Sequence, residues 1–237
     1  MIESGHGKSA VEALKPGLKS KHPDVLLLAG TMYEEGLCVQ ANRDKAAGLY
    51  MLADEAGNRS ALPRLIAGYA VAGRDNGLAL WWVATHWSRG AIPANCLPAV
   101  DPKANPDGFN DGLERMPPGL FQGCVYMAGV IAEMNAQMRF PPTALYNGVT
   151  GSVVMEFRPA DGTITWQPGE IDVNVNRGSF WRNLATAELE DPRAIKNSLL
   201  AYMKGKGQFA LSRYLRPDTG IDPDFVFKTT FSFDIRN

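Results

Sequence analysis

Few residues in this 237-residue chain have the types and spacing that catalysis requires. Gly5–Ser9 has the letters of the end of a phosphate-binding loop, but Ile2 stands where that loop needs glycine, and no strand precedes it. Ser152 lacks the glycine spacing of a nucleophile elbow. Glu188–Asp191 is acidic but precedes Pro192, as charge at a helix start does. The sequence therefore predicts a protein that is not an enzyme, with no catalytic residue, metal site or cofactor.

The cysteines and histidines leave one question open. The chain has 3 cysteines, Cys38, Cys96 and Cys124, which are too few for a disulfide scaffold and lack zinc-site spacing. Cys96 and Cys124 flank a proline-rich segment and could pair, but three buried thiols are the interpretation we favour. His86 is predicted to be packed rather than catalytic.

The composition indicates a folded chain whose positive and negative charges nearly balance. Hydrophobic residues make up 45% and charged residues 21%, enough to bury a core in one large domain or two small ones. Lys plus Arg (24) and Asp plus Glu (25) nearly balance at a net charge of −1, which argues against a nucleic-acid partner.

The ends and apolar stretches bear on the compartment. Residues 1–22 are basic, contain no apolar leader segment, and are predicted to be flexible. The longest apolar stretch, residues 124–132, is shorter than the roughly 20 residues that cross a bilayer. We expect a periplasmic protein whose leader is absent from this chain, with the cytoplasm as the alternative.

Residues 24–88 predict four helices, arranged as two similar pairs. Apolar residues recur there at helical spacing, and Gly36 and Gly57 are placed to end helices. Ala29–Gly30 matches Ala67–Gly68, and Ala46 matches Ala79. Such self-similarity is typical of stacked helix pairs.

An aromatic group closes this region. Trp81 and Trp82 point about 100° apart on a helix, so we expect that they cannot line one face together. With Trp87 nearby, core packing is the first interpretation; a partner surface and a small-molecule site are the alternatives.

The second half alternates strand and helix patterns. A helix is predicted at 121–138, strands at 148–157, 163–167 and 171–175, and a helix at 192–204 that Gly205 and Gly207 end. Asp161–Gly162 signals a hairpin, and 225–235 forms a last strand with strict alternation. Residues 91–119, with six prolines, predict a linker or surface strap. The fold class is α+β: N-terminal α-helical repeat pairs plus a C-terminal antiparallel sheet with flanking helices.

The first helix pair carries a family pattern. Leu28-Ala29-Gly30-x-x-Tyr33-x-x-Gly36, then Asp44-Lys45-Ala46 and Leu49-Tyr50-x-x-Ala53-x-x-x-Gly57, resembles a Sel-type repeat, a relative of the tetratricopeptide repeat. The second copy departs at Leu78 and His86, where Lys and Ala are usual. The resemblance implies a protein-binding scaffold. Two repeats are few for such a stack, so we expect other parts of the chain to shield them.

The last third carries another pattern. Phe140-Pro141-x-x-Ala144, Gly148, Gly151-x-Val153-x-Met155-x-Phe157 and Asp161-Gly162 resemble the entry to a TonB carboxy-terminal domain. The stretches 168–191 and 207–223 depart from it. The resemblance implies a sheet whose edge grips a short strand of another protein. This chain has no membrane anchor or long spacer, so a fold and a binding mode are implied more than energy transduction.

Together these features predict four regions: a flexible 1–22, Sel-like repeats at 23–90, a proline-rich linker at 91–119, and a TonB-like domain at 120–237. We expect a non-catalytic protein-binding protein of the bacterial cell envelope, with a toxin to be neutralised, a receptor or an envelope component as partner. A TonB-related adaptor and a hydrolase with an unrecognised site are the alternatives. The candidate partner-binding residues are Tyr33, Tyr50, Trp81, Trp87, Phe231 and Phe233.

Overall fold

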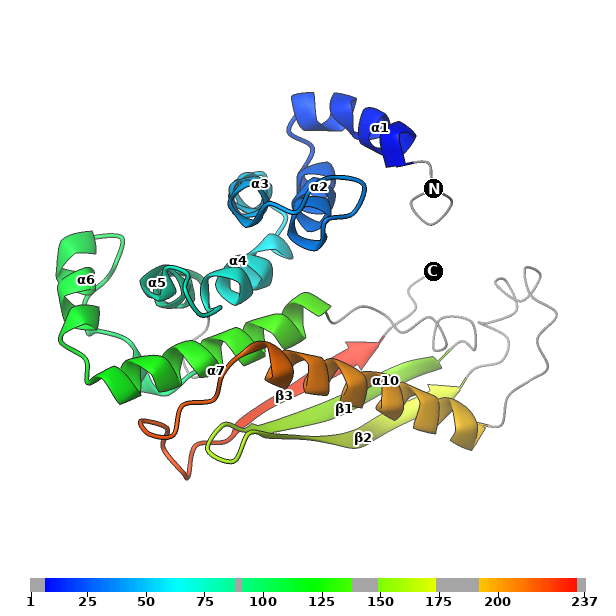
Figure 1. Cartoon of the computed structure of the whole chain (residues 1–237). Coiled ribbons are helices and arrows are strands. Elements are labelled where there is room, and N and C mark those ends of the chain that lie inside the picture. The colour runs from blue at the N-terminus through cyan, green and yellow to red at the C-terminus, as the bar shows by residue number, and fades with distance from the viewer. Residues whose placement is uncertain (1–6, 88–90, 138–148, 174–191, 234–237) are drawn as a thin grey trace. The chain divides into compact units, whose positions relative to one another are not determined.

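The computed structural model describes residues 7–87, 91–137, 149–173 and 192–233. It divides into two compact units, Met1–Pro117 with Cys124–Ala136, and Pro118–Gly123 with Gln137–Asn237. The first unit contains paired helices, and the second a three-stranded antiparallel sheet with a helix (Figure 1). The predicted α+β class is therefore confirmed. No helix among the described residues is long and apolar enough to cross a membrane.

The four helices predicted in residues 24–88 are present. They are α2 (Pro23–Glu35), α3 (Arg43–Glu55), α4 (Ala61–Tyr69) and α5 (Asn76–His86). Gly36 ends α2 in a left-handed conformation (φ 70°), as predicted. The cap of α3 is Asn42, whose side chain accepts a hydrogen bond from the backbone N–H of Lys45 at 2.9 Å.

A further helix precedes these four. Residues 7–19 form α1 (Gly7–Lys19) within the segment predicted to be flexible, so that prediction was wrong for these residues. Leu18 packs against the core of the following helices. Gly17 permits a close approach to α2, because a Cβ there would lie 2.6 Å from Val25 Cγ2. The helix is held by this contact with α2, which the pattern of 1–22 alone did not reveal.

The proline-rich segment also contains regular structure. A 3-10 turn, η1 (Ala94–Cys96), and a helix, α6 (Pro106–Glu114), lie within 91–119, the segment predicted to be a linker or surface strap. Pro106 occupies the first turn of α6, where a missing N–H donor costs nothing. Asn105 caps the helix by accepting from the N–H of Gly108 at 2.9 Å. Phe109 and Leu113 are buried.

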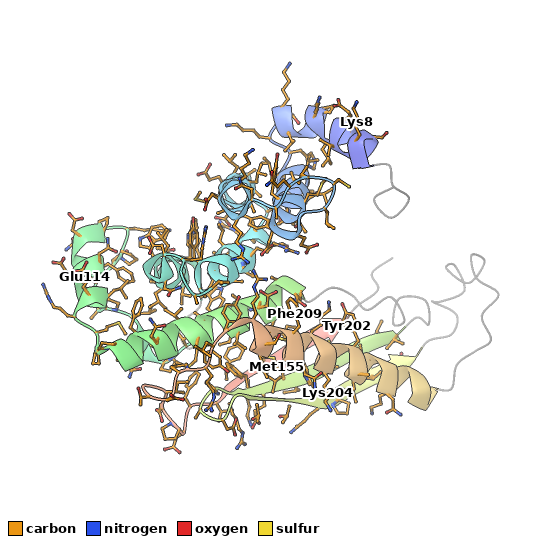
Figure 2. All side chains as sticks on the ribbon, viewed as in Figure 1. Lys8, Glu114, Met155, Tyr202, Lys204 and Phe209 are labelled. Atoms are coloured by element: carbon orange, nitrogen blue, oxygen red, sulfur yellow. A yellow bond between two sulfur atoms is a disulfide. The ribbon has the colours of Figure 1, made fainter. Side chains whose placement is uncertain are left out.

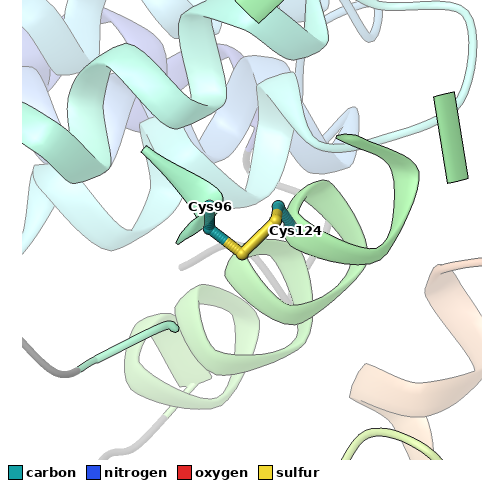
Figure 3. Close-up of a disulfide and its surroundings, with 2 residues drawn as sticks. All are labelled: Cys96 and Cys124. Carbon is teal, nitrogen blue, oxygen red and sulfur yellow. A yellow bond between two sulfur atoms is a disulfide. The ribbon is translucent and has the colours of Figure 1, made fainter. Parts of the chain in front are cut away.

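A disulfide joins Cys96 of η1 to Cys124 of α7 (Pro118–Gln137), as Figure 3 shows. Both half-cystines are fully buried, whereas Cys38 is a free, exposed thiol. The favoured interpretation of three buried thiols was therefore wrong, and the alternative pairing is the one observed. The bond ties the segment 91–103, called the strap below, to another part of the same unit.

The sheet of the second unit has the order β2-β1-β3, with both pairs antiparallel. Its strands are β1 (Val149–Arg158), β2 (Thr163–Val173) and β3 (Phe227–Phe233). The predicted Asp161–Gly162 turn joins β1 to β2, with Asp161 Oδ1 accepting from the N–H of Thr163 at 2.9 Å. The alternation predicted for β1 and for the last strand places Val153, Met155 and Phe231 on the same face of the sheet.

The two strands predicted at 163–167 and 171–175 form a single strand, β2, over the described residues, and a bulge lies between them. The register shifts between Gly151 and Val153, so Gly169 and Glu170 of β2 lie opposite the single residue Ser152. Glycine is needed here: a Cβ on Gly151 (φ 143°) would lie 2.1 Å from the Glu170 carbonyl oxygen. The prediction of separate strands at 163–167 and 171–175 was wrong over the described residues up to Val173.

The helix α10 (Pro192–Arg213) runs along one face of this sheet (Figure 1). Leu199 and Met203 pack with Val153 in a core that also contacts Trp166 and Phe231. Met155 of β1, labelled in Figure 2, is 1% exposed. The helix continues nine residues past Lys204, so Gly205 and Gly207 do not end it.

Gly207 has a packing role in α10. A Cβ there would lie 3.4 Å from both Ile164 Cγ2 and Trp166 Nε1 of β2, so the bare backbone lets helix and strand approach closely. Gly205, by contrast, has open space around its Cβ position. Packing thus explains the glycine at position 207, whereas nothing in the structure explains the glycine at position 205.

Gly151→Ala should lower the free energy of unfolding of the second unit by at least about 2 kcal/mol, because the new Cβ would collide with the backbone of β2. Gly205→Ala is the matched control and should raise it by roughly 0.5–1 kcal/mol, the gain of alanine over glycine in a helix. Urea titration followed by circular dichroism measures both. An unchanged midpoint for Gly151→Ala would contradict the bulge.

Replacing Cys96 and Cys124 together by Ser should destabilise the first unit by about 3–4 kcal/mol, since the bond closes a loop with a sequence separation of 28. Cys38→Ser should change stability by less than about 0.5 kcal/mol, because that thiol is exposed and unbonded. Denaturant unfolding with and without a reductant gives the comparison. A double variant as stable as the oxidised parent would show that the bond is not structural.

Candidate functional site

The predicted partner-binding residues of the first unit do not share one surface. Tyr33 is half-buried against the core of α2 and α3, and Lys45 Nζ lies 5.3 Å from its ring centroid. Tyr50 is only 2% exposed, so its ring offers no surface to a partner in this structure. Trp81 and Trp87 are both half-buried near the end of α5.

Tyr50 belongs to a polar network inside the helix stack. Its ring lies over Gly30, where a Cβ would be 2.5 Å from Tyr50 Cε1. Its hydroxyl donates to Glu34 Oε2 at 2.7 Å, and Arg64 Nη1 donates to the same oxygen at 3.0 Å. Burial, reinforced by the Glu34 carboxylate, raises the pKa of Tyr50 well above its usual range, so the phenol remains a donor. This network joins α2, α3 and α4.

The aromatic group at the end of α5 is tighter than the sequence predicted. The rings of Trp81 and Trp82 meet edge to face with centroids 5.1 Å apart, and Trp82 stacks on His86 at 5.0 Å. Because large side chains can lean towards each other, the two rings meet although the residues point about 100° apart on the helix. Trp82 also packs against the helical core.

His86 lies at a polar junction between α5 and α3. Its Nδ1 is 2.5 Å from Thr85 Oγ1, and its Nε2 is 3.9 Å from Asp54 Oδ2, too far for a hydrogen bond. Asp54 accepts from Arg59 at 3.0 Å. Burial, with the nearby charges of Lys103 and Arg59, lowers the pKa of His86, and Asp54 only partly opposes this. The imidazole therefore favours its neutral form.

The sequence pattern did not single out Asp54 or Lys103. Asp54 directly follows Ala53 on the inward side of α3 and is 8% exposed, so the spacing of its apolar neighbours was the available signal. No local pattern places Lys103 near His86, because the strap brings it there.

A groove of ≈ 760 Å³ lies between the C-terminal half of α5 and the strap. The α5 side is formed by Val83, Ala84, Thr85 and Trp87, and the opposite side by residues of 91–103. This strap groove includes one predicted partner-binding residue, Trp87, which the structure thus places at a concave surface. A smaller hollow of ≈ 320 Å³ lies beside α3, where Arg74 Nη2 pairs with Asp44 Oδ1 at 2.8 Å.

In the second unit, the predicted site residues belong to β3. The ring of Phe231 lies 6.0 Å from that of Trp166 and packs in the core beneath α10, rather than along the sheet edge. Phe233 pairs through its backbone with Gly151, and its side chain lies outside the described residues. The backbone of β3, more than these rings, is therefore what the strand can present at its outer edge.

The two edges of the sheet differ. On β2, Pro168 lacks an N–H donor, the bulge follows at once, and Glu170 and Asp172 are exposed. Proline, bulges and charges are the features that block a further strand. On β3, pairing with β1 runs in unbroken register from Phe227 to Phe233. A regular strand of this kind offers a regular outer edge.

The sheet face away from α10 is polar. Glu156 of β1 pairs with Lys228 at 2.8 Å and with Arg158 at 2.7 Å. Hydrogen bonds from Lys228 and Arg158 lower the pKa of Glu156, so it stays ionised at neutral pH. This carboxylate is matched by cations on both sides, which suits a structural role.

The part of the chain that the structure describes contains no group of three or more metal-ligating side chains. Comparison with known proteins gives no match: no family model, no curated protein and no solved structure is significantly similar to the chain. The site is therefore defined by its geometry, as a strap groove in one unit and, in the other, an outer edge of β3 with which no described strand pairs.

The stability of the first unit should fall as the pH drops from about 7 to 5. The pKa of His86 is lower in the folded chain than the unfolded value of about 6.5, so below that value the unfolded chain binds more protons. His86→Gln should flatten this dependence. Thermal unfolding of both proteins across this range measures it. A parent that gains stability on acidification relative to His86→Gln would show that Asp54 dominates instead.

Proposed function

We propose that this chain is a non-catalytic protein-binding protein, which takes up an extended segment of a partner as a fourth strand on the outer edge of β3. The observation that carries the proposal is the asymmetry between the two sheet edges. The partner would gain backbone hydrogen bonds from groups at this edge that no described strand engages, a recognition mode that tolerates varied partner sequences.

The two sides of β3 suggest the chemistry of the partner strand. Phe227 and Phe231 lie on the face covered by α10, whereas Lys228 and Thr230 are exposed on the other. A strand added beside β3 would have alternate side chains on these two faces. An amphipathic segment, apolar at every second residue and polar between, fits this edge best.

The helical unit supports the same function class. Its packed helix pairs, and the Sel-like spacing of Gly30, Tyr50 and Gly57, support the proposal of a scaffold that presents surface to other proteins. As expected for so short a stack, other segments of the chain, α6 and residues 124–136, belong to the same unit. The helical surface is a second docking region in this proposal.

The proposed location is the bacterial periplasm, with the cytoplasm as the alternative. A buried disulfide between Cys96 and Cys124 is consistent with an oxidising compartment. Within the envelope, a delivered toxin that this protein neutralises, a receptor, or another envelope component would be the partner. A TonB-related adaptor is the alternative that the hairpin, helix and last strand favour, although residues 140–148 of that resemblance lie outside the described residues.

The hydrolase alternative depends on His86. The structure does bring that imidazole to 3.9 Å from the Asp54 carboxylate. However, Arg59 already pairs with Asp54, and Trp82 stacks on the imidazole. Both contacts favour a packed junction over a catalytic pair, so protein binding remains the better-supported proposal.

Strand addition should be visible in the backbone amides. Twelve-residue peptides would be selected from a displayed random library against the intact, oxidised protein. Mass spectrometry would then measure amide exchange of the protein with and without the best peptide. We expect the bound peptide to slow amide exchange in 227–233 and to leave exchange in 163–173 unchanged. The reason is that β3 offers a regular edge and β2 does not. Protection of 163–173, or of the helical unit alone, would contradict the proposed edge.

A matched pair of variants sharpens this test. Thr230 and Thr165 are both exposed and lie on the same polar face, on β3 and β2 respectively. Thr230→Lys adds bulk and charge beside the proposed partner strand and should weaken peptide binding several-fold, whereas Thr165→Lys should not. Melting temperatures of both variants show whether the sheet is intact. Equal effects of the two variants would also count against β3.

A further inference from the structure

The outer edge of β3 lacks the features that block pairing at the other edge of the sheet. On β2 a proline, the bulge and exposed carboxylates oppose a further strand. The one charged residue of β3, Lys228, is already paired with Glu156 of β1 at 2.8 Å. A regular edge without such blocks associates with any extended strand within reach. Before a foreign partner arrives, the strand always within reach is β3 of a second copy.

The β3 strand matches itself in an antiparallel, two-fold arrangement. The register that pairs its whole length, Phe227–Phe233, places Thr230 of one copy directly opposite Thr230 of the second copy. Facing residues of antiparallel strands lie on the same side of a sheet. The side covered by α10 in one copy therefore continues as the α10 side of the other, and no side chain has to change face.

The facing pairs that this register creates are favourable. Thr230 is exposed, so its hydroxyl can hydrogen-bond to that of Thr230 in the second copy. On the α10 side, the half-buried Phe231 would face the half-buried Thr229 of the second copy. An aromatic ring opposite a β-branched residue is one of the pairs that stabilise antiparallel strands. The edge thus offers its own copy both kinds of contact.

Charge does not oppose the arrangement. Lys228 would face the exposed Ser232 of the second copy, and it would keep its own Glu156 as a partner. The two copies of Lys228 would lie four residues apart along the paired strands, which is about 14 Å at the rise of a strand. Exposed charges are screened within about 8 Å at physiological ionic strength. Repulsion between the two ammonium groups is therefore weak.

From this combination we propose that, without a bound partner, the chain forms a two-fold symmetric dimer through antiparallel pairing of the two β3 strands. This inference rests on the proposed partner-binding edge and adds a regulation to it. A foreign strand and the second copy would need the same backbone groups, so they compete. The dimer covers the edge until a partner displaces one copy.

Sedimentation velocity of the intact, oxidised protein across a range of concentrations tests the dimer. Thr230→Lys places two ammonium groups directly opposite each other and should weaken dimerisation at least about tenfold, as should Thr230→Glu with two carboxylates. An equimolar mixture of the two variants should dimerise again, because lysine then faces glutamate. Thr165→Lys, on the same polar face of β2, is the control and should leave the dimer unchanged.

The outcomes separate this inference from the proposed function. A parent that stays monomeric overturns the dimer, and if it still binds the selected peptide along 227–233 the proposed function stands. A dimer that survives both Thr230 variants, or a mixture that associates no better than either variant alone, also overturns it. Amide exchange of the parent needs no variant: exchange in 227–233 should slow as the protein concentration rises, and unchanged exchange would contradict the pairing.

Discussion

The packing of Tyr50 over Gly30 is the contact on which the helical unit depends. Because Gly30 has no side chain, the ring lies against the backbone of α2, and its hydroxyl emerges between Glu34 and Arg64. The Glu34 and Arg64 side chains are only 13% and 12% exposed, so the phenol supplies a hydrogen bond that this desolvated ion pair needs. One side chain thereby joins three helices, and a larger residue at position 30 would separate them.

The sheet depends on a different constraint, which is the parity of β2. The apolar residues Ile164 and Trp166 occupy even-numbered positions of β2, whereas Ile171 and Val173 occupy odd-numbered ones. A strand without interruption would place one set on the wrong face. The bulge at Gly169–Glu170 absorbs the extra residue, and Ile171 packs in the same core as Trp166. The same device that completes the core also blocks the β2 edge, so core packing and partner choice are linked.

These constraints explain which elements of the fold could be predicted from the sequence and which could not. The helices α2 to α5 and the alternation of β1 and β3 follow local periodicity, so they were predictable. The parity change in β2 was visible, but two strands and one bulged strand give the same pattern. α1 and α6 are held by contacts with residues outside each helix, such as Val25 against Gly17 and Pro98 against Gly112, which the pattern within each helix does not show. The Cys96–Cys124 pair likewise required a spatial partner that spacing does not specify.

The distribution of charge connects the structure with its proposed use. Glu34, Asp54 and Glu156 are nearly buried carboxylates, and each is paired with an arginine or a lysine. Such pairs hold elements together and leave little free charge for bond-making chemistry. What the described residues offer to other molecules is shape: a regular strand edge and a groove beside the strap.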